Sequence, residues 1–228
     1  MPPTTNGDQP VTRVTLRPLG STLPLGALTL VPAGTLLAGL QLGWFPPNEA
    51  PIVAYALLGF AVPLQLVASV LAFLARDSLV GTGFAVFTGI WLAFGLTTVS
   101  GSVGETSRVL GVFFLCCAAV FLILVGGGIA GGKAAAGAVI LFGAVRFVLS
   151  GLYELTGSSG VEHAAGIVGL VFVAVAGYVG LATLLEDNAH RSILPIGRRG
   201  AARAAIDEGY RAQLGHALER EAGVREQL

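Results

Sequence analysis

Charged side chains are scarce in this chain of 228 residues, where lysine, arginine, aspartate and glutamate together make up 11%. An average soluble domain carries about 25%. Hydrophobic residues reach 54%, and the mean hydropathy is +0.80. Thirteen basic and thirteen acidic residues cancel, so the charge balance gives no indication of a nucleic-acid partner. This composition excludes an ordinary soluble domain and indicates an integral membrane protein.

Residues that carry enzymatic chemistry are also few. The three histidines, His163, His190 and His216, are far apart and do not have the spacing of a metal site. Cys116 and Cys117 are neighbours in one apolar segment, so they point in different directions and we interpret them as packing thiols. A nucleophile elbow and a zinc-protease helix are both missing from the sequence. We therefore expect no metal, no cofactor and no enzymatic activity.

Six apolar windows are long enough to cross a membrane, which takes about 20 residues of helix. They cover about 23–43, 51–75, 80–99, 109–130, 134–153 and 162–185. The predicted fold is an all-α membrane protein whose six transmembrane helices form a compact bundle within residues 21–197. A mobile tail of residues 1–20 should precede the bundle. A charged tail, 198–228, should follow, with a short amphipathic helix predicted by Ile206, Tyr210 and Leu214 at helical spacing.

Basic residues predict the orientation of the bundle. Arg76 and Lys133 stand in even-numbered loops, and seven arginines follow the last span, whereas Arg108 is the single cation of the odd-numbered loops. Arginine and lysine in short loops favour the cytoplasmic side. Both termini should therefore be cytoplasmic, in a multi-pass protein of the cell membrane.

The first span, residues 21–42, is interrupted by Pro32 and contains hydroxyls such as that of Thr29. A proline inside a helix removes one donor and frees a carbonyl about one turn earlier. That carbonyl needs a partner inside the protein, because hydrocarbon offers none. We therefore predict a broken helix that lines a pathway.

Polar and aromatic side chains also stand inside the second and third spans. Gln65, close to Pro63, either hydrogen-bonds to a neighbouring helix or lines the path. In the third span, the i, i+3, i+4, i+7 spacing places four side chains on one helix face. These are Phe84, Phe87, Thr88 and Trp91. This face indicates either helix packing or a gate.

Arg146 is a charge well inside the fifth span. Charge within a membrane is costly and marks a functional candidate. Three interpretations remain open: the side chain extends to the interface, it pairs with Glu154 two turns later, or it attracts an anion. At the start of the sixth span, His163 beside Glu162 is a candidate sensor of external pH.

Two ends of the bundle carry recognisable motifs. The start, Pro24-Leu25-Gly26, is similar to the end of an Asn-Pro-Ala-Pro-Leu-Gly signature, and the segment Arg191-Ser192-Ile193-Leu194-Pro195-Ile196-Gly197 after Tyr178 is similar to a closing Leu-Pro-Ile-Gly. Both signatures are those of the acetate uptake transporter family, the SatP/YaaH and fungal Ato proteins. Gln65, Phe84, Trp91, His163 and the segment 165–169 fall where similar residues stand in that family. The resemblance covers about residues 21–197.

This resemblance implies a ring-shaped assembly, a hexamer, with one solute path in each protomer. The implied solutes are acetate and related short carboxylates such as succinate, taken up together with protons. Some members are described as channel-like, and fungal members are linked to ammonium export. The chain departs from the family at Ser21-Thr22-Leu23, which replaces Asn-Pro-Ala, at Phe87, where bacterial members carry tyrosine, and at Arg146, where the family is usually apolar. These departures leave the substrate open.

Our hypothesis is that residues of the first three spans, together with Tyr178, surround a narrow path. The path residues of those spans are Pro24, Leu25, Gly26, Thr29, Leu30, Gln65, Phe84, Phe87, Thr88 and Trp91. The expected partners are a small carboxylate, protons, the lipid bilayer and further copies of the chain. Two alternatives remain: a passive channel for ammonia, urea or an undissociated acid, and a membrane scaffold or sensor that does not transport.

Overall fold

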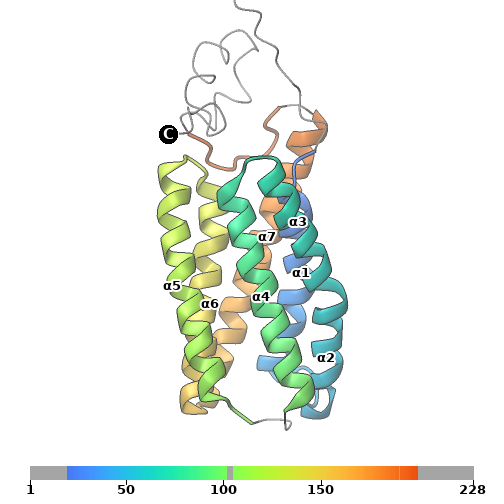
Figure 1. The fold of residues 1–228 in the computed structure, drawn as a ribbon, viewed down its shortest axis with the longest axis vertical. Helices are drawn as coiled ribbons and strands as arrows, with labels where there is room; N and C mark the ends of the chain where they lie inside the picture. The colour runs from blue at the N-terminus through green and yellow to red at the C-terminus, as the bar shows by residue number, and fades with distance from the viewer. Residues whose placement is uncertain (1–19, 102–104, 190, 200–228) are drawn as a thin grey trace, which may run out of the picture.

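Six helical spans, each long and apolar enough to cross a membrane, run along the long axis of the described chain (Figure 1). The structure is a computed structural model that describes residues 20–101, 105–189 and 191–199. The spans are α1 (Leu23–Gln41), α2 with α3 (Ala50–Ala56 and Val62–Leu74), α4 (Ser78–Ser100), α5 (Arg108–Ala130), α6 (Ala134–Thr156) and α7 (Ser159–Ala189). The prediction of an all-α protein with six membrane-length helices is confirmed.

The tails predicted from the sequence fall almost wholly outside this range. The mobile segment 1–20 and the amphipathic helix within 198–228 lie outside the described residues, apart from Gly20, Arg198 and Arg199. Those two arginines lie against the bundle: the backbone N–H of Arg199 donates to the carbonyl of Gly132 at 3.1 Å. The described segment after α7 therefore returns to the loop between α5 and α6.

The outer surface of the bundle is apolar. Ile52, Val109, Ile123 and Ile129 are 65%, 81%, 75% and 72% exposed. In water, so many exposed apolar side chains would favour aggregation. In a bilayer they face lipid tails. Together with the six spans, this surface makes the chain a multi-pass membrane protein.

Neighbouring spans form a closed ring. α1 packs beside α7, α7 beside α6, α6 beside α5, α5 beside α4, α4 beside α3 and α3 beside α1. Because the number of spans is even, α1 begins and α7 ends at the same end of the bundle, the upper end in Figure 1. Side chains that point into the ring from different spans can therefore meet along its axis.

Close approach of α5 and α6 depends on two glycines. A Cβ atom on Gly151 would lie 2.9 Å from the carbonyl oxygen of Gly111, and one on Gly111 would lie 3.0 Å from the carbonyl oxygen of Gly151. Small residues allow such contact between helices in a membrane. Alanine at either position would push the two backbones apart.

The prediction that Pro32 breaks the first helix is wrong. α1 is continuous from Leu23 to Gln41, and the Thr29 hydroxyl donates to the carbonyl of Leu25 at 2.7 Å. Membrane helices tolerate an internal proline when nearby groups satisfy the freed backbone atoms. The irregular turn lies instead in the second span, where the π-helical turn η2 (Leu57–Ala61) directly precedes the helix that contains Pro63. Such turns often mark functional positions.

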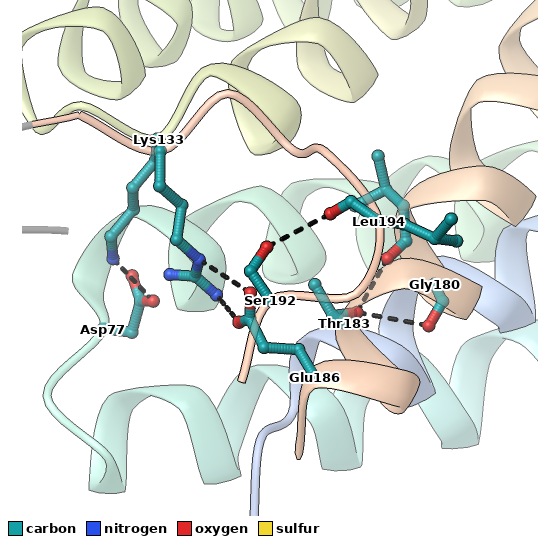
Figure 2. A network of polar contacts seen from close by, with 9 residues as sticks. Asp77, Lys133, Gly180, Thr183, Glu186, Ser192 and Leu194 are labelled. Carbon is teal, nitrogen blue, oxygen red and sulfur yellow. Dashed lines mark hydrogen bonds and ion pairs between the residues drawn. The ribbon is translucent and has the colours of Figure 1, made fainter. Parts of the chain in front are cut away.

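Ion pairs hold the end of the bundle at which α1 begins and α7 ends. Lys133 pairs with Asp77 at 2.7 Å, which joins the α5–α6 loop to the start of α4 (Figure 2). Glu186 near the end of α7 pairs with Arg198. The Tyr178 hydroxyl donates to the carbonyl of Pro195 at 2.8 Å. Together with the bond from Arg199 to Gly132, the contacts of Arg198 and Pro195 fasten residues 191–199, which we call the closing segment, against α7 and the α5–α6 loop.

Candidate solute path

A cavity of about 840 Å³ opens at the end of the bundle opposite the start of α1 and the end of α7. We call it the vestibule. Residues of α1, α4, α5, α6 and α7 and of the loops between them line it, among them Gln41, Phe94, Leu110, Phe114, Ser150 and Glu162. Its position inside the ring, and its volume, which falls in the usual range of ligand pockets of about 300–1,000 Å³, make it the candidate entrance of a solute path.

The vestibule is lined by acidic side chains. Its lining includes the carboxylates of Glu105, Glu154 and Glu162 and the imidazole of His163. None of the described residues that line it is lysine or arginine. A carboxylate oxygen of Glu154 accepts a hydrogen bond from the backbone N–H of Ser107 at 2.7 Å. The vestibule therefore concentrates cations, protons included, and repels anions that approach from the water.

Beyond the vestibule floor lies Arg146, which is 0% exposed. Its Nη2 donates to the side-chain oxygen of Gln41 at 3.3 Å, and Gln41 Nε2 donates to the Ser150 hydroxyl at 3.3 Å. Gln41 and Ser150 both line the vestibule. A buried guanidinium thus stands directly behind two polar groups that face the cavity.

Two of the interpretations of Arg146 are wrong. The side chain does not extend to the interface, because it is completely buried. It also does not pair with Glu154, whose carboxylate instead caps the backbone at Ser107. The Nε and Nη1 atoms of Arg146 have no hydrogen-bond partner. The bond to Gln41 gives Arg146 a structural partner on α1, and attraction of an anion stays a prediction.

Five aromatic side chains from α4, α5, α6 and α7 meet inside the ring. We call them the aromatic cluster: Phe87, Trp91, Phe121, Phe147 and Phe172. The ring centroid of Phe87 lies 4.6 Å from that of Phe121, 5.6 Å from Phe172, 6.1 Å from Phe147 and 6.4 Å from Trp91. None of the five is more than 1% exposed. The cluster therefore joins four of the six spans inside the ring.

A polar contact crosses the ring beside this cluster. The indole N–H of Trp91 donates to the side-chain oxygen of Gln65 at 3.0 Å, and Gln65 Nε2 lies 3.5 Å from the carbonyl oxygen of Gly26. The ring of Phe84 packs directly on Gly26, where a Cβ atom would lie 2.0 Å from it. These contacts bring together α1, α3 and α4.

On the far side of Phe87 lies a small inner cavity of about 20 Å³. Its lining is entirely apolar and includes Ala27, Val80, Phe84 and Ile140. The volume suffices for little more than one water-sized probe, which takes about 10–15 Å³. The inner cavity is therefore too small to hold an acetate in this structure.

The structure brings some of the predicted path residues together and leaves others apart. Phe87 borders the inner cavity, and Leu30 is completely buried. Pro24 is also buried, while Leu25 is 36% exposed. Tyr178 lies apart from both cavities: it is 43% exposed and bonds to the closing segment.

The two predicted threonines are buried, but their hydroxyls are used within their own helices. Thr29 donates to Leu25, and Thr88 donates to the carbonyl of Phe84 at 2.8 Å. Such a bond to the preceding turn satisfies the hydroxyl without another partner. A solute would have to compete with these bonds.

Sequence reasoning missed the vestibule floor and four aromatic residues. Gln41 is a polar residue at the end of the first span, and Ser150 stands four residues after Arg146, on the same helix face. That spacing was a usable signal. Phe114, Phe121, Phe147 and Phe172 gave no signal, because isolated phenylalanines are ordinary in membrane helices.

No model of a known family and no curated protein matches the chain. Among solved structures, the bacterial acetate channel SatP matches with a TM-score of 0.69 and 22% sequence identity. The alignment covers 78% of this chain and 99% of the SatP chain. At this identity the similarity establishes the fold: the chain is a six-helix membrane bundle of the SatP type. The resemblance seen in the sequence motifs is thereby confirmed at the level of the fold.

Proposed function

We propose that this protein is a transporter, not an enzyme, and that it carries acetate and related short carboxylates, succinate among them, across a membrane. One observation supports this above the others: a vestibule of about 840 Å³ opens into the interior of a bundle with the fold of an acetate channel. An enclosed path with one wide mouth and one narrow neck suits a small solute.

The path we propose runs through each protomer from the vestibule, past the aromatic cluster, to the inner cavity. Phe84, Phe87 and Trp91 narrow it, and Gln65 offers a carboxamide at the narrowest part. Removing a polar solute from water costs several kcal/mol unless such groups replace its hydrogen bonds. We further assign Pro24, Leu25, Gly26, Thr29, Leu30 and Thr88 to the walls of this path, and we leave Tyr178 out because it is 43% exposed and bonds to Pro195.

We also propose that uptake is linked to protons. The aromatic cluster is apolar, so a carboxylic acid crosses it more easily when neutral than when ionised. The acidic lining of the vestibule attracts protons on the entrance side. Both effects favour passage at acid external pH.

The orientation and the assembly are likewise proposals. We place both chain ends in the cytoplasm of a cell, because Arg76, Lys133 and most other loop cations lie at that end of the bundle. The vestibule then opens outward. We expect the protein to form a ring-shaped hexamer in which the apolar outer surface of each bundle faces lipid or a neighbouring copy.

The test is uptake of labelled acetate and succinate by proteoliposomes that contain the purified protein. Uptake should exceed that of empty liposomes and should rise when the external buffer is made acid relative to the interior. Uptake that ignores an imposed pH gradient would remove the proton link. No acetate uptake under any gradient would remove the proposed function.

A second function is favoured by the chemistry of the narrowest part. Gln65 and the five residues of the aromatic cluster contain no group that titrates near neutral pH. Passive, downhill passage of an undissociated acid, ammonia or urea would need none. Swelling of vesicles in these solutes, without any pH gradient, distinguishes passive from proton-linked passage.

The scaffold alternative has its own test, a chain that ends at Arg199. If the protein is a transporter, this truncated chain should still take up acetate; a scaffold that does not transport should show no uptake at either length.

A further inference from the structure

We propose that Arg146, Gln41 and Ser150 form a binding site for a carboxylate anion at the floor of the vestibule, before the aromatic cluster is reached. The proposal rests on the proposed transport function and names the form in which the solute is first bound. It predicts that the protein selects anions at this position and neutral molecules further along the path.

The first argument is the unbalanced charge of Arg146. The guanidinium is 0% exposed, two of its three nitrogens lack a hydrogen-bond partner, and none of its described contacts is a carboxylate. A buried charge without a counter-charge costs several kcal/mol. A negative ligand bound beside the guanidinium would lower this cost.

The second argument is the place of Gln41. Its carboxamide has the flat, forked shape of a carboxylate, and its oxygen lies 3.3 Å from Nη2 of Arg146. Gln41 is the last residue of α1, and two residues later Gly43 turns the chain with a φ of +72°. A side chain at a helix end, lining the vestibule, is well placed to be displaced by a solute. An acetate in its position would accept a charge-assisted hydrogen bond from Nη2, the nitrogen that now donates to Gln41.

Ser150 and Gly169 complete the site. The Ser150 hydroxyl now accepts from Gln41, and because hydroxyls also donate, it can donate to an anion once Gln41 has moved. On the other side, the guanidinium occupies the space above Gly169: a Cβ atom there would lie 2.0 Å from Nη1 of Arg146. This glycine on α7 therefore sets the pose of the guanidinium.

The acidic lining of the vestibule works against an anion but does not cancel the site. Glu154 and Glu162 line the vestibule, which opens to solvent, and solvent ions screen their charges. Arg146 is out of water, where the same charge acts more strongly over a given distance. An anion is therefore repelled at the mouth and held at the floor.

The experiment measures thermal unfolding of the full-length protein in detergent, at constant ionic strength, with increasing acetate or acetamide. Acetate should raise the unfolding temperature in a concentration-dependent manner, and acetamide, which has the same shape without the charge, should not. Equal stabilisation by both would overturn the proposal.

Arg146→Met removes the charge and keeps an apolar side chain of similar length. A hydrogen bond to a charged group contributes about 1.5–3 kcal/mol, so the acetate dissociation constant should rise about 10- to 100-fold. Arg108→Met is the matched control, because it removes an exposed guanidinium that does not line the vestibule. The control should respond to acetate as the wild type does. An unchanged response of Arg146→Met would overturn the proposal.

Gln41→Glu decides the question if Arg146→Met does not fold. This change supplies a carboxylate from the chain itself, so the variant should unfold at a higher temperature than the wild type and should not respond to acetate. A wild-type response of Gln41→Glu to acetate would overturn the proposed site.

Uptake in proteoliposomes separates failure of the site from failure of the proposed function. If the wild type and both variants take up acetate equally, the site is wrong and transport stands. If the wild type takes up none, the proposed function itself fails.

Discussion

The indole N–H of Trp91 donates to the side-chain oxygen of Gln65 at 3.0 Å, and both side chains are 0% exposed. The bond joins α4 to α3 at the level of the aromatic cluster. Both partners are polar groups that solvent does not reach, so the loss of either would leave the other without this hydrogen bond. The pair therefore holds the wall of the proposed path and offers a polar group to a passing solute.

Gln65→Leu should destabilise the protein and slow transport. The indole N–H of Trp91 would be left without an acceptor, at a cost of about 1–3 kcal/mol. The measurements are the unfolding temperature in detergent and acetate uptake in proteoliposomes.

The double variant Gln65→Leu/Trp91→Phe separates the two effects. It removes donor and acceptor together, so stability should return toward that of the wild type while uptake stays low. If the double variant is less stable than Gln65→Leu alone, the unpaired indole N–H does not explain the destabilisation of Gln65→Leu.

Phe87→Ala should widen the neck. Phe87 contacts four other members of the aromatic cluster and borders the inner cavity, so its removal joins spaces that are now separate. We expect larger carboxylates to compete with labelled acetate more effectively than in the wild type, with a loss of about 3–5 kcal/mol of stability from the new cavity. Phe60→Ala, at a residue 43% exposed on the outside, is the control. Identical selectivity in Phe87→Ala and wild type would remove Phe87 from the neck.

Gly26→Ala should force the Phe84 ring out of its position. The new Cβ atom would lie 2.0 Å from that ring, and overpacking of this kind costs about 1–3 kcal/mol. Adding Phe84→Leu should restore part of the lost stability, because the smaller side chain leaves space for the methyl group. Thermal unfolding of both single variants and the double variant measures the coupling. If the two effects simply add, the residues are not in contact.

Replacing Glu154 and Glu162 together by glutamine should weaken the dependence of acetate uptake on external pH. Near neutral pH the ionised carboxylates repel an approaching acetate, and as the pH falls their protonation removes that repulsion and uptake rises. In the double variant only Glu105 of the three lining carboxylates is left, so the repulsion is weaker at every pH and uptake near neutral pH should rise toward its value in acid. Glu49→Gln, at the same end but outside the vestibule lining, should keep the wild-type profile. If the double variant has the same pH profile of uptake as the wild type, Glu154 and Glu162 do not cause the pH dependence.

The spans were predictable because hydrophobic length is a local property. The structure begins α1 at Leu23 and α5 at Arg108, and both ends of each predicted window lie within four residues of the ends of the observed span. The aromatic face of α4 was also predictable, since the spacing of Phe84, Phe87 and Trp91 is a property of one helix. Pro32 was misjudged because a proline removes a single bond, which the rest of a long membrane helix can tolerate.

By itself, the sequence determined the membrane class, the number of spans and the motifs of the SatP-type fold, since all three depend on residues close together in the chain. Tertiary structure alone decided what Arg146 contacts. Gln41 lies 105 residues away from it in sequence and Ser150 lies one turn away, yet all three meet because α1 and α6 pack against α7 in one ring. Such contacts depend on how the helices pack, and the order of residues within one span does not contain that information.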